Sequence, residues 1–204
     1  MPAQNKEAYF EGLGIDPALV ELYHERLGDV DRVLDVGCGT GSIGRHLPDT
    51  VEVVGVDIDR GALERAKGHE RPLLSDLESE SLPFADDTFD GIIAKDVLEH
   101  LVRPSPIVQE LYRVLKPGNR LVVSVPMAKK HVVWGDYTHI RGFTEGALET
   151  MLRDYGFDVV DITPMGGFSG AGRFGLVKQL PWLLSVPPLR RFAVSHEGVF
   201  EKPR

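Results

Sequence analysis

The stretch from Val33 to Leu47, VLDVGCGTGSIGRHL, constrains the fold more than any other part of the chain. Its first four residues are mostly apolar and partly β-branched, which suits a strand buried on both faces of a sheet. Gly37, Gly39 and Gly41 follow at alternate positions, where a tight turn adopts positive φ and a ligand can approach the backbone. We expect a helix to begin at Ser42, with its free N–H groups facing that ligand. A strand, a glycine turn and a helix in this order predict a nucleotide-type binding site.

Two kinds of ligand fit this pattern. Gly39-x-Gly41-x-x-Gly44 matches the dinucleotide fingerprint, and Asp57 lies at about the distance expected of a ribose-binding acid. Asp35, however, ends the strand, where its carboxylate would repel a pyrophosphate and attract a ligand that carries an ammonium and a sulfonium. We therefore favour a ligand of this second kind over a dinucleotide.

Composition excludes several classes of function. The 204 residues suffice for one domain with a substantial core. The net charge of −8 argues against a general nucleic-acid binder, which needs a basic surface. Cys38 is the single cysteine, which excludes an internal disulfide and fits a reducing compartment. No apolar run suits a signal peptide or a membrane span, so we expect a cytoplasmic protein without nucleic-acid partners or stable membrane insertion.

Hydrophobic periodicity and capping residues predict alternating helices and strands along the chain. The predicted helices cover residues 17–27, 59–67, 106–115 and 145–155. The predicted strands cover residues 33–36, 51–56, 71–76, 89–94, 121–125, 157–162 and 192–201. Buried strands that alternate with helices are typical of a mostly parallel sheet.

The chain resembles the class I S-adenosylmethionine-dependent methyltransferases of the small-molecule type. The resemblance rests on DVGCGTG at 35–41, SLPFADDTFD at 81–90 and RVLKPGNRLVVSVP at 113–126, and it covers about residues 31–163. It implies a three-layer α/β sandwich around a Rossmann-like, seven-stranded, mostly parallel sheet with a final antiparallel strand. It also implies one methyltransferase domain over residues 1–204, with an N-terminal helical lid at 1–30, a core at 31–163, and a variable lid and last strand at 164–204.

The resemblance further implies S-adenosyl-L-methionine as the cofactor and S-adenosyl-L-homocysteine as its product. Asp57 ends a predicted strand and would accept hydrogen bonds from both ribose hydroxyls, with Ile58 against the adenine. Asp76 and Leu77 match the positions that meet the adenine in the family. The expected cofactor-binding residues are Asp35, Gly37, Cys38, Gly39, Gly41, Asp57, Ile58, Asp76, Leu77 and Lys95.

The loop at 127–144 contains the expected catalytic residues. Asp136 and His139 belong to a D-x-T-H-x-R-x-F-T pattern that resembles one branch of the family, in which the histidine lies near the site of methyl transfer. The two would form a carboxylate–imidazole pair that orients a general base or, equally, a structural clamp that fixes the loop. His100 is interpreted mainly as a positioning or packing residue. His131, Asp136 and His139 have no recognised zinc spacing, so no metal site is predicted.

The predicted reaction transfers a methyl group to an oxygen, nitrogen or carbon nucleophile of a small-molecule acceptor, mainly by proximity and orientation. Hydrophobic and lipid-linked acceptors are included, and the protein is expected to be a monomer or a homodimer. A non-catalytic S-adenosylmethionine-binding module, an NAD-dependent oxidoreductase and an aminopropyltransferase are the alternatives. The proline-interrupted apolar segment at 174–192 predicts a short helix that covers the sheet or a dimer surface. The alternatives are a lid for a hydrophobic substrate and a patch that touches a membrane surface.

Overall fold

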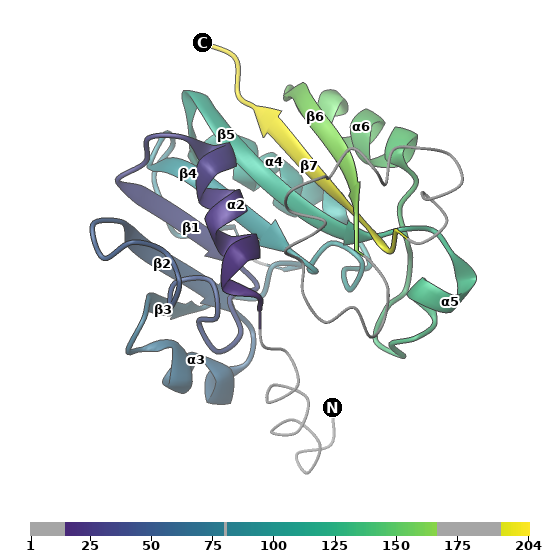
Figure 1. The fold of residues 1–204 in the computed structure, drawn as a ribbon. Helices are drawn as coiled ribbons and strands as arrows, with labels where there is room; N and C mark the ends of the chain where they lie inside the picture. Colours follow the sequence, from purple (N-terminus) through teal and green to yellow (C-terminus); the bar gives the residue numbers. More distant parts are fainter. Residues whose placement is uncertain (1–14, 80, 167–192) are drawn as a thin grey trace.

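A computed structural model describes residues 15–79, 81–166 and 193–204 (Figure 1). Its helices are α2 (Pro17–Leu27), α3 (Arg60–Ala66), α4 (Pro104–Val114), α5 (Lys130–Val133) and α6 (Glu145–Asp154). Its strands are β1 (Arg32–Val36), β2 (Glu52–Asp57), β3 (Arg71–Leu74), β4 (Phe89–Lys95), β5 (Leu115–Pro126), β6 (Asp158–Met165) and β7 (Ser195–Glu201). None of the described helices has the length and apolar character needed to cross a membrane. The segment 174–192 and residues 1–14 of the expected N-terminal lid lie outside the described residues.

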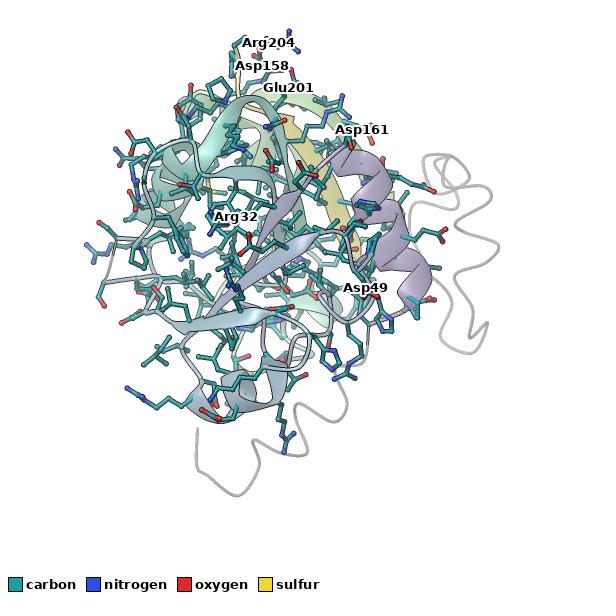
Figure 2. All side chains as sticks on the ribbon, turned by 90° about the vertical axis from the view of Figure 1, so that its left-hand side faces the viewer. Arg32, Asp49, Asp158, Asp161, Glu201 and Arg204 are labelled. Atoms are coloured by element: carbon teal, nitrogen blue, oxygen red, sulfur yellow. The ribbon has the colours of Figure 1, made fainter. Side chains whose placement is uncertain are left out.

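The strands form a seven-stranded sheet in the order β3-β2-β1-β4-β5-β7-β6. Pairing from β3 through β5 is parallel, whereas β7 pairs antiparallel with both β5 and β6. The antiparallel register places Asp158 opposite Glu201, and Figure 2 shows both at one end of the molecule near Arg204. This topology confirms the predicted mostly parallel sheet with a final antiparallel strand.

Helices cover both faces of the sheet, because successive side chains of a buried strand point to opposite sides. On one face, Tyr23 of α2 belongs to a core cluster with Val33 of β1 and Ile93 of β4. On the other face, Leu34 of β1 belongs to a second cluster with Ile107 of α4. Figure 1 shows α2 in front of the sheet and α4 behind it. The predicted three-layer sandwich is therefore confirmed, and α2 packs on the centre of the sheet rather than at its edge.

The segment after the glycine turn does not form the helix predicted from Ser42. Residues 39–46 form consecutive turns instead. The N–H of Arg45 donates to the Gly41 carbonyl at 3.1 Å, as in a helix, but the N–H of Gly44 donates to the Glu70 carboxylate at 2.9 Å. A side-chain acceptor thus replaces a helical carbonyl, and two glycines in one turn make a helix costly in conformational entropy.

β5 also begins earlier than predicted. It runs from Leu115 to Pro126 and includes the KPGN segment that was expected to separate a helix from a strand. A register irregularity in the pairing with β4 and the positive φ of Gly118, 80°, accommodate that segment within the strand. The sequence pattern therefore located the strand but not its start.

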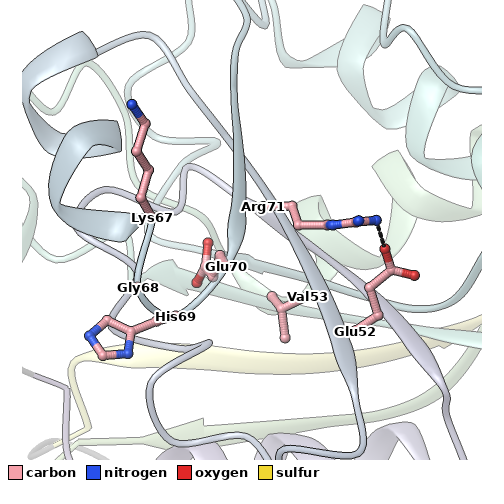
Figure 3. Close-up of a pocket in the computed structure, with 7 residues that line it drawn as sticks. All are labelled: Glu52, Val53, Lys67, Gly68, His69, Glu70 and Arg71. Atoms are coloured by element: carbon pink, nitrogen blue, oxygen red, sulfur yellow. Dashed lines mark hydrogen bonds and ion pairs between the residues drawn. The ribbon is translucent and has the colours of Figure 1, made fainter.

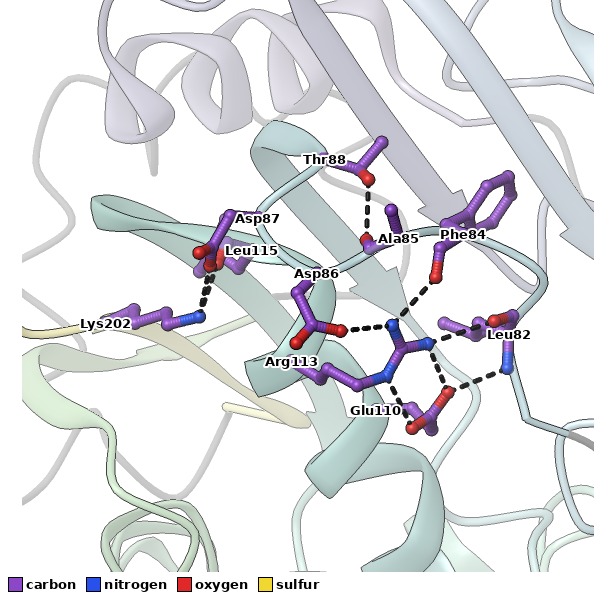
Figure 4. Close-up of polar contacts among 10 residues, drawn as sticks. All are labelled: Leu82, Phe84, Ala85, Asp86, Asp87, Thr88, Glu110, Arg113, Leu115 and Lys202. Atoms are coloured by element: carbon purple, nitrogen blue, oxygen red, sulfur yellow. Dashed lines mark hydrogen bonds and ion pairs between the residues drawn. The ribbon is translucent and has the colours of Figure 1, made fainter.

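The loop before β4 is anchored by the guanidinium of Arg113 in α4 (Figure 4). Its Nη1 donates to the Phe84 carbonyl at 2.7 Å and to the Asp86 carboxylate at 2.9 Å. Its Nη2 donates to the Leu82 carbonyl at 3.0 Å. Glu110, one turn earlier in α4, accepts from Nε at 2.9 Å and from Nη2 at 2.7 Å. One side chain therefore fixes the whole approach to the central strand β4.

We expect Arg113→Met to lower the free energy of unfolding by about 2–3 kcal/mol, because two backbone carbonyls and two carboxylates lose a charged donor. Urea unfolding would measure the change. Arg153→Met is the matched control, because Arg153 makes a half-exposed pair with Glu149 within α6 and its loss should cost about 0.5 kcal/mol or less. Equal losses in the two variants would contradict the anchoring role of Arg113.

Candidate functional site

The expected cofactor residues gather at the carboxyl ends of β1 and β2. Gly37, Gly39 and Gly41 have φ values of 71°, 52° and 75°, the left-handed conformation predicted for the glycine turn. The N–H groups of Gly37 and Cys38 donate to the Val56 carbonyl at 2.8 and 3.1 Å. The predicted turn is therefore present, and its start is tied to β2.

Asp57, the last residue of β2, adds a second set of hydrogen bonds that hold the glycine turn. Its Oδ2 accepts a hydrogen bond from the N–H of Gly39 at 2.9 Å, and its Oδ1 accepts one from the N–H of Asp59 at 2.8 Å. Each carboxylate oxygen has a further lone pair, so these bonds orient the side chain and still leave acceptors for ribose hydroxyls. Ile58, the next residue in the chain, is an apolar side chain that is 66% exposed.

Asp35, whose charge was expected to attract the ligand, is buried in the core. Its side chain is 1% exposed, and its pKa lies well above the usual value because of burial and the neighbouring Glu70 carboxylate. Burial also raises the pKa of Glu70, whose Oε1 accepts from the N–H of Gly44 at 2.9 Å. Asp35 and Glu70 are therefore neighbouring buried carboxyls, and the expectation that the charge of Asp35 attracts a sulfonium stays a prediction.

A glycine in β2 makes room for this buried pair. A Cβ at Gly55 would lie 2.1 Å from Glu70 Oε2 and 2.6 Å from Cys38 Sγ. Burial raises the pKa of the Cys38 thiol, with a further contribution from the Asp35 carboxyl. Cys38 therefore packs as a small apolar residue behind the turn.

Asp76 and Leu77 lie just beyond β3. Hydrogen bonds from the Ser79 hydroxyl at 2.6 Å and the Glu78 N–H at 3.0 Å lower the pKa of the Asp76 carboxyl. Leu77 is 8% exposed, and its side chain belongs to the core. Local hydrogen bonds thus fix the Asp76 carboxylate at the edge of the sheet, and the Leu77 side chain serves packing.

A buried polar network connects Lys95 at the end of β4 with β7 and α2. The Lys95 ammonium pairs with the Asp96 carboxylate. Ser124, opposite Lys95 in β5, donates to Oε1 of Glu197 at 2.9 Å, and the Tyr23 hydroxyl donates to Oε2 at 2.8 Å. Glu197 is 2% exposed, and burial raises its pKa to about 7 despite these bonds. The network places a titratable carboxyl two strands away from Lys95, with β5 between them.

The loop at 127–144 brings His139 to the end of β4, but its partners differ from those expected. Oδ1 of Asp136 accepts from the Thr138 N–H at 2.8 Å and from the Thr138 hydroxyl at 2.6 Å. His139 Nε2 lies 3.9 Å from Oε1 of Glu99, and its ring packs edge-to-face on His100 with centroids 4.8 Å apart. The Asp136 side chain thus bonds Thr138 rather than the His139 imidazole, so the expected carboxylate–imidazole pair is not formed among these described residues, and Asp136 shapes the turn that carries His139.

A separate pocket of about 260 Å³ lies at the opposite end of the strands (Figure 3). Glu52 and Arg71, which begin β2 and β3, line it together with Lys67. Open α/β sheets bind ligands at the carboxyl ends of their strands, so this pocket is not the expected cofactor site.

Comparison with known proteins decides the family. A family profile described as "Methyltransferase domain" matches residues 34–123. An uncharacterized methyltransferase of Mycobacterium leprae is 30% identical over 200 residues, which cover 84% of this chain and 72% of the relative. The chain belongs to the S-adenosylmethionine-dependent methyltransferases.

Two further proteins show how this methyltransferase compares with relatives. The ubiquinone/menaquinone biosynthesis C-methyltransferase UbiE of Geobacter sulfurreducens is 38% identical over 109 residues, covering 48% of this chain and 43% of the relative. The crystal structure of a SAM-dependent methyltransferase from Archaeoglobus fulgidus has a TM-score of 0.72 at 20% identity, covering 91% of this chain and 92% of that one. The second likeness shows the fold.

Sequence reasoning missed three buried acids of the methyltransferase, namely Glu70, Glu99 and Glu197. Glu70 precedes a predicted strand, and nothing local marks it as buried. Glu99 has a weak signal, because it stands between apolar residues just after β4. Glu197 has a different sequence signal, because an acid within a predicted buried strand needs a hydrogen-bond or ionic partner. Each depends on contacts between distant segments, which a single sequence does not display.

The raised pKa of Glu197 predicts a pH-dependent stability. The folded state binds this proton more tightly than the unfolded chain, so its contribution to the free energy of unfolding is lost as pH rises from about 5 to about 8. Glu197→Gln cannot titrate, so this pH-dependent loss of stability is absent from the variant. Between pH 5 and pH 8 we therefore expect the free energy of unfolding of the variant to rise by about 1–3 kcal/mol relative to that of wild type. Urea unfolding at several pH values measures it, with the exposed Glu25→Gln as control. Parallel pH profiles of wild type and Glu197→Gln would contradict the assignment.

Proposed function

We propose that this methyltransferase binds S-adenosyl-L-methionine across the carboxyl ends of β1 and β2 and transfers its methyl group to a small-molecule acceptor. The observation that carries the proposal is the Asp57 carboxylate, which is bonded to the glycine turn through Gly39 and still has free acceptor capacity. In the proposed complex Asp57 holds the ribose, Ile58 and Asp76 meet the adenine, and the glycine turn and the backbone at Lys95 approach the methionine part.

Loss of the Asp57 carboxylate should abolish cofactor binding. We expect Asp57→Ala to bind S-adenosyl-L-homocysteine at least 100-fold more weakly in isothermal titration, because both the ribose acceptors and a support of the turn disappear. Asp49→Ala is the matched control, since Asp49 is exposed and lies between the turn and β2 (Figure 2). Tight binding of NADH by wild type, without binding of either adenosyl ligand, would favour the oxidoreductase alternative instead.

Catalysis in this proposal comes chiefly from placing the acceptor in line with the methyl carbon and excluding water. The sulfonium is already an activated leaving group, so the protein supplies little covalent chemistry. An acceptor that arrives protonated must also lose its proton. We propose that His139, held beside Glu99 and His100, serves that step, and that Asp136 positions it by shaping the loop.

Replacing His139 should slow methyl transfer without weakening the binding of the cofactor. We expect His139→Ala to lower kcat by about 100-fold or more for a hydroxyl acceptor found by screening with methyl-labelled S-adenosylmethionine. Binding of S-adenosyl-L-homocysteine should stay within twofold of wild type. His131→Ala is the control, because His131 is exposed in the same loop. Near-normal turnover in His139→Ala would remove the histidine from the mechanism.

The acceptor class is open to oxygen, nitrogen and carbon nucleophiles. The relative UbiE is named a C-methyltransferase of ubiquinone/menaquinone biosynthesis, which supports including hydrophobic and lipid-linked acceptors in the screen. Affinity for the cofactor with no transfer to any acceptor would point to the non-catalytic binding module.

A further inference from the structure

An acid and two imidazoles meet where the chain leaves β4 and the loop 127–144 folds back on it. Glu99 and His100 are neighbours in the chain, and His139 comes from the loop. One potential ligand atom from each lies within 4.8 Å of the other two. Donor atoms around a divalent cation with bonds of about 2.1 Å are roughly 3–4 Å apart, so small side-chain rotations would close the site.

Glu99 is a buried carboxyl without a hydrogen bond. It is 0% exposed, and neither of its oxygens has a hydrogen-bond partner among the residues that the structure describes. Its Oε1 has His139 Nε2 at 3.9 Å, beyond hydrogen-bond distance. A buried, unpaired carboxyl of this kind costs free energy that a bound cation would recover.

The two histidines are arranged as ligands require. His100 Nδ1 lies 3.3 Å from the Thr138 carbonyl, and because a carbonyl only accepts, Nδ1 carries the proton and Nε2 keeps its lone pair. Metal-bound histidines commonly donate their second N–H to a carbonyl in this way. Nδ1 of His139 is buried without a hydrogen-bond partner among the described residues, so this ring is not committed to another group.

We propose that Glu99, His100 and His139 bind a divalent transition-metal cation, and that this cation holds a hydroxyl oxygen of the methyl acceptor. Two imidazoles and one carboxylate suit ions such as Zn²⁺, Co²⁺, Mn²⁺ or Fe²⁺ rather than Ca²⁺ or Mg²⁺. Three protein ligands leave coordination positions for an acceptor or water. The inference rests on the proposed function only for the identity of that bound oxygen.

With the cation bound, His139 would act as a ligand, and the cation would promote the deprotonation of the acceptor in place of the histidine. A metal-bound hydroxyl has a lowered pKa, so it releases its proton to solvent on binding. The oxygen lone pair then forms the new bond to the methyl carbon, while the carbon–sulfur bond breaks and its electrons stay on sulfur as S-adenosyl-L-homocysteine. One proton is released for each methyl group transferred, and no oxidant or reductant is needed. The proposal thereby narrows the acceptor to an oxygen nucleophile.

The test titrates untagged, chelator-treated full-length protein with Co²⁺ and follows the visible ligand-field absorption. We expect one equivalent to bind, with affinity at least tenfold weaker in Glu99→Gln and in His139→Ala and unchanged in His131→Ala. Glu99→Gln should fold, because it removes a buried, unpaired carboxyl while keeping its shape. Acetohydroxamate, a small oxygen chelator, should then shift the absorption bands if coordination positions are open.

Each outcome is informative. Absence of stoichiometric binding, or equal Co²⁺ affinity in wild type and both ligand variants, would overturn the metal site. If Co²⁺ binds but acetohydroxamate does not shift its absorption bands, the proposal that the cation holds the acceptor oxygen would be overturned. Binding of S-adenosyl-L-homocysteine by the chelator-treated protein is measured in parallel. If that binding fails while Co²⁺ binds, the proposed function is wrong and the metal site stands, whereas the reverse result rejects the metal site alone.

Discussion

The carboxylate of Asp57 holds together the end of the sheet at which we propose that the cofactor binds. It bonds the N–H of Gly39 in the glycine turn and the N–H of Asp59 after β2. Asp59 in turn caps α3, since its Oδ1 accepts from the N–H groups of Gly61 and Ala62 at 2.8 and 3.0 Å. One side chain therefore sets the conformation of the turn and, through its neighbour, the start of a helix. The same side chain has the acceptor capacity that a ribose needs, so structure and binding are coupled.

Buried acids behind and beside this site impose a second constraint. Each removes a carboxyl from water, which is unfavourable unless hydrogen bonds or a proton compensate. Glu70 bonds the N–H of Gly44, and Glu197 accepts from Tyr23 and Ser124. Neither oxygen of Glu99 has a hydrogen-bond partner among the described residues. Its position at the end of β4, facing the loop of His139, is why we assign it a ligand rather than a purely structural role.

The sequence was sufficient wherever a feature depends on neighbouring residues. The glycine turn, the strand that ends in Asp57 and the alternation that yields a parallel sheet are local patterns, and the structure confirms them. The helix expected after the turn failed because Glu70, from a segment more than twenty residues later, accepts the hydrogen bond of Gly44. The burial of Asp35 against Glu70, which raises the pKa of the Asp35 carboxyl, was not anticipated for the same reason. Contacts between distant segments decided both cases.

The loop 127–144 shows the same limit at the residues proposed to be catalytic. The sequence predicted a pair between Asp136 and His139, but the carboxylate bonds Thr138 while the imidazole faces Glu99. Which acid accompanies a histidine is set by how the loop folds onto β4, and the spacing within the loop does not contain that information. The cofactor half of the site was therefore predictable to a larger extent than the catalytic half.

A crystal structure of the protein with S-adenosyl-L-homocysteine tests the central claim most directly. The account predicts the ribose on the carboxylate of Asp57, the adenine beside Ile58, and the sulfur directed toward the cluster of Glu99, His100 and His139. A ligand bound instead in the pocket between Glu52 and Arg71, at the amino ends of the strands, would contradict it.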